Sequence, residues 1–191
     1  MASRQRPEFD RLVAAVSREL GSRGVPHFLI GGQAVLLHGA PRLTQDIDVS
    51  LNVGPEQIAV VEDACAAIGL EPLVADPADF ARETFVLPVQ SESTGVRVDF
   101  IFSNTEFERL AVDRAVQVAL SGESVPFASP EDLILFKLLA GRARDIDDAR
   151  SVVGRQGTGL DWSYIERWAR AFAEVPGRED LPKRVADLRR S

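Results

Sequence analysis

Two aspartates one residue apart, Asp46 and Asp48, lie in the segment QDIDVSLN, in which polar and apolar residues alternate. This alternation predicts a β-strand over residues 45–52. Alternate residues of a strand share one face, so we expect the two carboxylates side by side, with Cα atoms about 7 Å apart. Neighbouring carboxylates repel each other unless a cation lies between them. Because hard divalent ions such as Mg²⁺ prefer oxygen ligands, the pair predicts a metal site.

A third carboxylate, Asp99, lies in GVRVDFIFS, which predicts a second strand over residues 95–103. Its apolar neighbours indicate a buried strand, in which an unpaired charge would be costly. If the two strands are adjacent, three carboxylates meet at one metal site, where two ions would lower the pKa of an attacking hydroxyl and neutralise charge on phosphorus. The alternatives are a salt bridge between Asp99 and Arg97 or another cation, and a solvated strand face for Asp46 and Asp48.

A glycine pair, Gly31 and Gly32, separates the apolar strand predicted over 27–32 from the helix predicted over 33–39. Glycines at such a junction let backbone N–H groups approach phosphate oxygens, and the helix N-terminus favours the negative charge. Arg42 and Thr44 lie just before the carboxylates and are further candidates for phosphate contact. The alternatives are a solvated loop arginine and a β-forming residue at the start of a strand.

The surrounding elements follow from hydrophobic periodicity and from helix start and stop signals. They predict an α/β part over residues 1–128 and a helical part over residues 129–191. The predicted strands are 27–32, 45–52, 83–90, 95–103 and 123–128. The predicted helices are 7–24, 33–39, 55–70, 105–120, 129–141, 144–154, 160–175 and 178–190.

The composition of the 191 residues is that of an ordinary globular protein, with 45% hydrophobic and 27% charged residues. One cysteine and two histidines exclude a Cys/His metal cluster and an internal disulfide. No signal-type region or apolar run suggests a membrane span, so we expect a cytoplasmic protein. The net charge of −7 argues against a general polyanion-coating protein. It leaves open a local basic cleft, for example at the arginines of residues 142–155.

Together, these residues resemble a known sequence signature. The pair Gly31-Gly32, followed after thirteen residues by Asp46-Ile47-Asp48-Val49 and later by Val98-Asp99-Phe100, resembles that of DNA polymerase β-like nucleotidyltransferases. Within this superfamily, the segment KLLAGRARDIDDARSVV is similar to a downstream element of the AbiE-type and MenAT-type toxin nucleotidyltransferases. The resemblance covers residues 27–155. The matching downstream residues are Lys137, Arg144, Asp145 and Asp148.

The resemblance implies a nucleotidyltransferase-type mixed β-sheet with flanking helices, followed by a C-terminal helical bundle that forms the other wall of a cleft. It implies transfer of a nucleoside monophosphate from an NTP to an acceptor hydroxyl, with release of pyrophosphate. Asp46 and Asp48 would hold two Mg²⁺ ions, with Mn²⁺ as an alternative. Asp99 would complete the metal site and help to deprotonate the acceptor, and Lys137 would meet the triphosphate.

The sequence departs from the family pattern at one point, because many relatives have Gly-Ser where this chain has Gly31-Gly32. Backbone groups or Gln33 must then replace the missing hydroxyl contact to phosphate. Lys137 has the alternative of a helix-face lysine whose charge reaches solvent. The alternative for Asp145 and Asp148 is that negative side chains near the start of a helix stabilise that helix whatever the function of the protein.

The toxin resemblance implies a tRNA acceptor, modified at its 3′ end so that aminoacylation and translation stop, and a cognate antitoxin protein as partner. Nucleotidylation of a protein and nucleotidylation of a small compound, such as an aminoglycoside or lincosamide, are the alternative enzyme functions. From a different class, the chain would be a binding module that keeps the fold without turnover. Retention of all three carboxylates argues against that last alternative.

Overall fold

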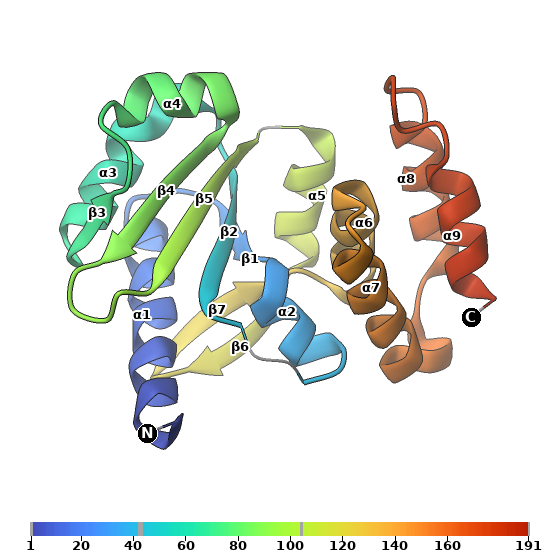
Figure 1. Cartoon of the computed structure of the whole chain (residues 1–191), viewed down its shortest axis with the longest axis horizontal. Coiled ribbons are helices and arrows are strands. Elements are labelled where there is room, and N and C mark those ends of the chain that lie inside the picture. The colour runs from blue at the N-terminus through green and yellow to red at the C-terminus, as the bar shows by residue number, and fades with distance from the viewer. Residues whose placement is uncertain (1, 42–43, 104, 191) are drawn as a thin grey trace. The chain divides into compact units, whose positions relative to one another are not determined.

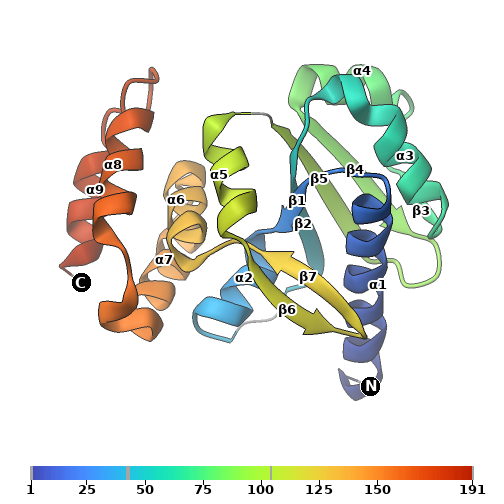
Figure 2. The same ribbon diagram turned by 180° about the vertical axis from the view of Figure 1, so that it is seen from behind.

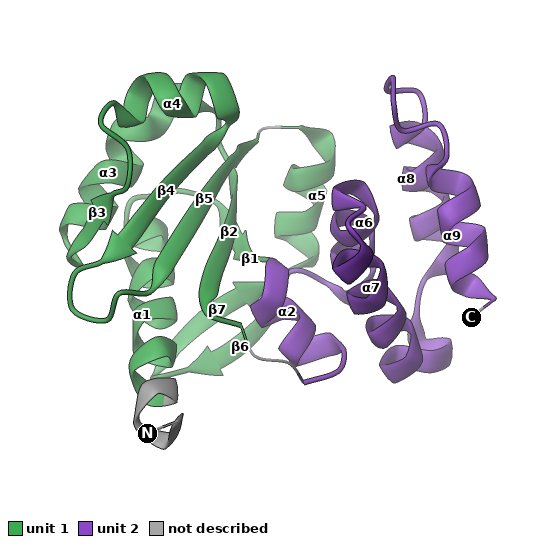
Figure 3. Ribbon diagram, in the orientation of Figure 1, with its two compact units in different colours: residues 1–30, 44–127 green, residues 31–43, 128–191 purple. Residues whose placement is uncertain are grey.

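A computed structural model describes residues 2–41, 44–103 and 105–190, with backbone alone for residues 2–6. The chain forms two compact units (Figure 3). Unit 1 comprises Met1–Ile30 and Thr44–Phe127, and unit 2 comprises Gly31–Leu43 and Ala128–Ser191. Within the described part of the chain, every helix is too short or too polar for a membrane span. The α/β architecture predicted from the sequence is confirmed.

Unit 1 contains a mixed sheet, whose strands in the described residues lie in the order β3-β4-β5-β2-β1-β7-β6 (Figure 1). The pairs β2–β5 and β1–β7 are parallel, and the other neighbours are antiparallel. The strands are β1 His27–Leu29, β2 Asp46–Asn52, β3 Leu70–Pro72, β4 Val86–Ser91, β5 Arg97–Ser103, β6 Val116–Leu120 and β7 Glu123–Phe127.

One face of the central strands is apolar and buried. Its members alternate along β2 and β5, and they are Ile47, Val49, Leu51, Val98, Phe100 and Phe102. Figure 2 shows α1 and α3 in front of the sheet, where they contact each other. The helical segments of unit 1 are α1 Ala2–Ser22, η1 Pro55–Gln57, α3 Ile58–Ala66, α4 Pro77–Thr84 and α5 Glu106–Arg114. Because strand side chains alternate, the residues between the apolar ones point to the opposite face.

The helix predicted over 105–120 is wrong in its second half, because α5 ends at Arg114 and residues 116–120 form β6. The backbone becomes extended at Ala115, with ψ of 135°. The strand then turns at Ser121 and Gly122, whose φ angles of 49° and 89° suit a tight hairpin. The sequence analysis also missed the short strand β3 and the helix α4.

The helical segments of unit 2 are α2 Gly31–His38, α6 Pro130–Ala140, α7 Ala143–Gln156, η2 Gly157–Gly159, α8 Trp162–Phe172 and α9 Leu181–Arg189. The end of α7 holds the end of α2 through backbone carbonyls. Arg155 Nη1 donates to the Gly39 oxygen at 2.7 Å, and Gln156 Nε2 donates to the His38 oxygen at 3.0 Å. Residues 31–43 therefore group with the C-terminal helices, although the sequence-based division placed them in residues 1–128.

A buried hydrogen-bond network fixes the start of α6. Ser129 caps the helix, accepting from the Asp132 backbone N–H at 3.1 Å and donating to Asp132 Oδ2 at 2.6 Å. The hydroxyl of Tyr164 on α8 donates to Asp132 Oδ1 at 2.6 Å. Because Asp132 is fully buried, these donors replace the water that its carboxyl group loses on folding.

The network predicts that Tyr164→Phe will lower the free energy of unfolding by about 2 kcal/mol, since a buried carboxyl group loses one donor. Chemical denaturation monitored by circular dichroism measures the change. Ser163→Ala, which removes an exposed hydroxyl from the same helix, is the control and should change stability by less than about 0.5 kcal/mol. Equal stability of Tyr164→Phe and the wild type would contradict this role for the hydrogen bond.

Candidate active site

Three predicted metal ligands share one face of the sheet. The strands β2 and β5 pair in parallel, and their register places Asp48 opposite Asp99 and Asp46 opposite Arg97. Neighbouring strands lie about 4.8 Å apart, so these side chains start close together. Asp46 is exposed, whereas Asp48 and Asp99 are half-buried. We call these three carboxylates together with Arg97 the carboxylate face.

A guanidinium engages the third carboxylate. Arg97 Nε donates to Asp99 Oδ1 at 2.8 Å, and the Arg97 side chain is 49% exposed. Its hydrogen bond and charge interaction with Asp99 raise the pKa of Arg97, and the charges of Asp46 and Asp48 add to this shift. The salt bridge that the sequence offered as the alternative for Asp99 is thus present.

The donor set of the carboxylate face suits a hard divalent ion. Three carboxylates offer only oxygen ligands, and Mg²⁺ accepts such ligands while leaving positions for substrate phosphates. Within the described ranges, however, no three acidic, histidine or cysteine side chains are already arranged around one metal position. The residues therefore fit a metal ion chemically, provided that Asp99 exchanges Arg97 for the cation.

The segment before the glycine pair is fixed to β2. The Ile30 backbone N–H donates to the Asp48 oxygen at 3.0 Å, which extends the β1–β2 pairing as far as this aspartate. The chain then enters α2 at Gly31, whose φ of +63° lies in the left-handed region that favours glycine. Gly32 is buried and Gln33 is half-buried. The sequence-predicted phosphate ligands Gly31, Gly32 and Gln33 therefore occupy the first turn of this helix.

The two loop residues predicted to contact phosphate have different outcomes. Thr44 Oγ1 donates to the Asp46 backbone oxygen at 3.4 Å, a contact that supports the start of β2. Arg42 lies outside the described residues.

The structure also shows a buried hydroxyl that sequence reasoning did not select. Ser50 follows Asp48 by two residues and shares its face of β2, but only 1% of its surface is exposed. Among the described atoms, Ser50 Oγ has no hydrogen-bond partner. The signal that could have identified Ser50 is the alternation of β2, which places it on the same face as Asp46 and Asp48. A serine in a strand is otherwise ordinary.

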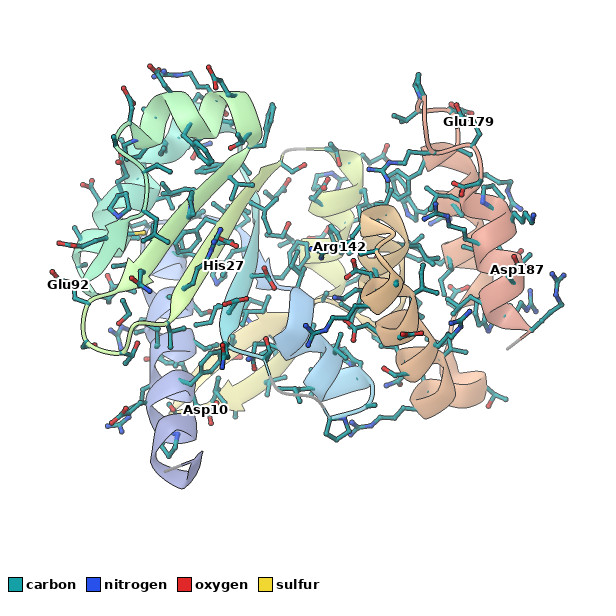
Figure 4. The ribbon with its side chains drawn as sticks, viewed as in Figure 1. Asp10, His27, Glu92, Arg142, Glu179 and Asp187 are labelled. Atoms are coloured by element: carbon teal, nitrogen blue, oxygen red, sulfur yellow. The ribbon has the colours of Figure 1, made fainter. Side chains whose placement is uncertain are left out.

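The downstream residues form a buried cluster in unit 2. Lys137 Nζ lies 3.0 Å from Asp145 Oδ1 and 2.8 Å from Asp148 Oδ2, and all three side chains are buried. Arg142 Nε, on a side chain that is 78% exposed, approaches Asp145 Oδ2 at 2.6 Å. Arg142 is labelled in Figure 4. We call Lys137, Asp145 and Asp148 the buried cluster. Arg144, predicted with them, is exposed and lies outside it.

Local geometry explains how the buried cluster forms. Gly141 ends α6 in the left-handed region, with φ of +69°, and Arg142 begins the next helix. Asp145 and Asp148 are three residues apart on α7 and therefore share the face that meets Lys137. Burial raises the pKa of Asp145, but the hydrogen bonds and charges of Arg142 and Lys137 outweigh burial, so the pKa lies below its usual value. Lys137 is thus fully engaged inside unit 2 rather than extended to solvent.

Comparison with protein families decides the relationship of the chain. The family described as "Nucleotidyl transferase AbiEii toxin, Type IV TA system" matches residues 22–185, which include the carboxylate face and the buried cluster. The chain belongs to this family. It is therefore an AbiEii nucleotidyltransferase, which confirms the resemblance drawn from the glycine pair, the carboxylates and the downstream segment KLLAGRARDIDDARSVV. A comparison with curated protein sequences finds no match.

Solved structures support the fold of this AbiEii protein. A solution structure of the antibiotic-resistance factor ANT(2'')-Ia matches with a TM-score of 0.60 and 14% identity over 87% of this chain and 94% of that chain. ANT(2")-Ia in complex with adenylyl-2"-tobramycin matches with a TM-score of 0.57 and 16% identity, over 87% and 98%. An antigenic nucleotidyltransferase-like protein from Paracoccidioides brasiliensis matches with a TM-score of 0.53 and 16% identity, over 91% of each chain. These identities are too low to transfer a substrate.

The buried cluster predicts that Lys137→Met will lower the free energy of unfolding by about 3–5 kcal/mol, because two buried carboxylates lose their shared cation. The matched control is Arg142→Gln, which removes the exposed cation on Asp145 and should cost less than about 1 kcal/mol. Urea denaturation at pH 7 measures both variants. Equal losses in the two variants would contradict a special role for the buried lysine.

The pH dependence gives the same prediction a second readout. A carboxyl group whose pKa is lowered on folding stabilises the protein above its unfolded pKa, and this stabilisation is lost as the pH falls through the lower folded value. For Asp145 the loss begins near its ordinary value of 3.8 and continues below it. The deficit of Lys137→Met relative to the wild type should therefore narrow as the pH falls through this range.

Proposed function

We propose that this AbiEii protein is a toxin that transfers a nucleoside monophosphate from an NTP to an acceptor hydroxyl with the help of divalent ions on the carboxylate face. The in-register parallel pairing of β2 with β5 carries the proposal, because it sets Asp48 beside Asp99 on one face with Asp46. A face of three carboxylates is electrostatically unfavourable by itself and becomes favourable when cations bind.

The chain's own residues would have distinct roles. Bound Mg²⁺ or Mn²⁺ would supply charge neutralisation at phosphorus and a lower pKa for the attacking hydroxyl. Asp46 and Asp48 would hold the ions, and Asp99 would complete their shell and help to take the proton from the acceptor. The backbone N–H groups of Gly31 and Gly32, at the start of α2, would bind phosphate oxygens with the help of the helix dipole.

The downstream residues remain candidates for nucleotide binding. Lys137 would meet the triphosphate as a point charge, and it would first have to exchange Asp145 and Asp148 for phosphate. Arg144 precedes Asp145 in the sequence and is exposed, so it could bind phosphate without leaving a buried carboxylate. Asp145 and Asp148 would act by holding Lys137 in place.

We propose a tRNA 3′ end as the acceptor, so that the modified tRNA is no longer aminoacylated and translation stops. Charge is divided unevenly along the chain, which supports a local RNA-binding region despite the acidic total. The segments 31–43 and 128–191 hold thirteen basic and eleven acidic residues, whereas the remainder holds nine basic and eighteen acidic residues. Exposed arginines on α8, Arg167 and Arg170, offer phosphate contacts. A cognate antitoxin would neutralise the toxin.

The acidic composition of unit 1 favours a second candidate, a small cationic acceptor. The fold is shared with ANT(2")-Ia, which has been solved in complex with adenylyl-2"-tobramycin. A cationic aminoglycoside would be attracted to a negative surface. Protein nucleotidylation is a third possible outcome of the same experiment.

The deciding experiment incubates the purified chain with Mg²⁺ and each labelled NTP in turn, together with bulk tRNA, cell protein or an aminoglycoside. Label on tRNA supports the proposed acceptor, whereas label on a polypeptide or on the aminoglycoside assigns the alternative acceptor. If none of the acceptors is labelled and Asp46→Asn retains any toxicity of the wild type in cells, the protein acts by binding instead of by transfer.

The carboxylate face predicts that Asp46→Asn, Asp48→Asn and Asp99→Asn will each lower the rate of transfer about 10³-fold, since metal stabilisation of the reaction is worth several kcal/mol. Single-turnover assays with labelled NTP measure the rate. Asp113→Asn, an exposed aspartate paired with Arg109 on α5, is the control and should retain the wild-type rate. Near-wild-type rates for any of the three variants would remove that carboxylate from the proposed site.

The tRNA proposal predicts that the double variant Arg167→Gln and Arg170→Gln will bind tRNA more weakly and with a smaller salt dependence. Each phosphate contact that is lost should lower the slope of log K against log salt by about 1. Filter binding at salt concentrations from about 50 to 200 mM measures this slope, because the affinity for nucleic acid changes strongly over this range. Arg82→Gln on α4 of unit 1 is the control, and an equal effect in the control would argue against RNA binding through α8.

A further inference from the structure

We propose that Arg97 is a positioning residue that acts as a built-in counter-ion for the carboxylate face, so that a divalent ion must displace its guanidinium from Asp99 in order to bind. This role rests on the proposed metal site, because Arg97 would compete with the metal ion for Asp99 on the same strand. Arg97 would thereby set the metal concentration at which the site fills.

The geometry of β2 and β5 gives Arg97 its place. Arg97 and Asp99 are two residues apart on β5 and share its face, and Asp46 lies directly opposite Arg97 on β2. The guanidinium holds Asp99 Oδ1 at 2.8 Å, an oxygen that a metal ion would need. Asp48 and Asp99 are direct neighbours across the strands, and like charges at such positions repel each other. A cation nearby reduces this repulsion, and Arg97 supplies one to Asp99.

The sequence around the site makes this arginine distinctive. Residues 44–127 hold fifteen acidic and four basic residues, and Arg97 alone of the four lies within β2 or β5. The basic residues on the helices have nearby partners of their own, such as Asp79 for Arg82 on α4 and Asp113 for Arg109 on α5. Among the basic residues of 44–127, Arg97 is thus the one placed on the strand that carries Asp99.

Exposure makes the exchange feasible. The Arg97 side chain is half exposed and the Asp99 side chain is 22% exposed, so a displaced guanidinium can be hydrated instead of being left buried. The contact is also a single Nε–Oδ1 hydrogen bond in the described atoms, rather than a two-pronged pair. By contrast, the Lys137 side chain in the buried cluster is only 8% exposed, so its release from Asp145 and Asp148 would cost more free energy than release of Arg97 from Asp99.

The test measures metal binding rather than turnover. Free Mn²⁺ is titrated by electron paramagnetic resonance against the full-length wild type, Arg97→Gln, Arg97→Lys and the control Arg82→Gln. Arg97→Gln should bind Mn²⁺ about three- to tenfold more tightly, because it removes a partly exposed competing charge. Arg97→Lys keeps that charge and should stay closer to the wild type. Arg82→Gln should equal the wild type.

Unchanged or weaker Mn²⁺ binding by Arg97→Gln would overturn the counter-ion role and leave Arg97 as a structural residue. Failure of the proposed metal site would give a different result. The wild type and Asp46→Asn would then bind Mn²⁺ equally, or neither would bind it, and both proposals would be wrong.

A measurement on the wild type covers the case in which Arg97→Gln does not fold. The Nε–Hε resonance of Arg97, assigned by its loss in Arg97→Lys, is followed by NMR as Mg²⁺ is added. A shift that saturates together with metal binding supports displacement from Asp99. A resonance that does not move at saturating Mg²⁺ overturns it.

Discussion

β2 and β5 pair in parallel in a register that sets Asp48 opposite Asp99, and the proposed metal site of unit 1 depends on this pairing. A shift by one residue would turn Asp99 to the apolar face, where Ile47 and Phe100 are almost completely buried. The apolar residues of both strands oppose such a shift, because they would move out of the core. The hydrophobic core therefore fixes the positions of the carboxylates, and their mutual repulsion is the cost that a cation must offset.

The protein uses acidic and basic side chains in two different environments. On the carboxylate face, Asp46 is exposed and Arg97 is half exposed, so these charges are accessible from solvent. In the buried cluster, Lys137 and its two aspartates are almost fully enclosed, and removing Lys137 would take a buried cation from both carboxylates. This difference in burial separates the proposed metal site from a cluster that joins α6 to α7. Both lie within the match to the AbiEii nucleotidyltransferase family.

Local patterns could predict that Asp46 and Asp48 share one face, because the alternation that shows it lies within a single short segment of the sequence. They could not predict that Asp99 lies opposite Asp48, since this pairing joins segments about fifty residues apart in the chain. The grouping of residues 31–43 with the C-terminal helices depends on distant side chains such as Arg155, for which the local sequence has no signal. At Val116 the helical pattern of α5 appeared to continue, but pairing with β7 determined a strand. Arg97 was considered only as an ion-pair partner of Asp99, and its position opposite Asp46 became visible through the register.

The most direct measurement for the central claim is the anomalous scattering of Mn²⁺ in crystals of the full-length protein. We predict a strong anomalous peak on the carboxylate face, with oxygens of Asp46, Asp48 and Asp99 at about 2.1 Å, the coordination distance of a small hard cation. Arg97 should then lie away from Asp99 Oδ1. A metal-soaked crystal without density at these aspartates, or with the Arg97–Asp99 pair intact beside an ion bound elsewhere, would contradict the account.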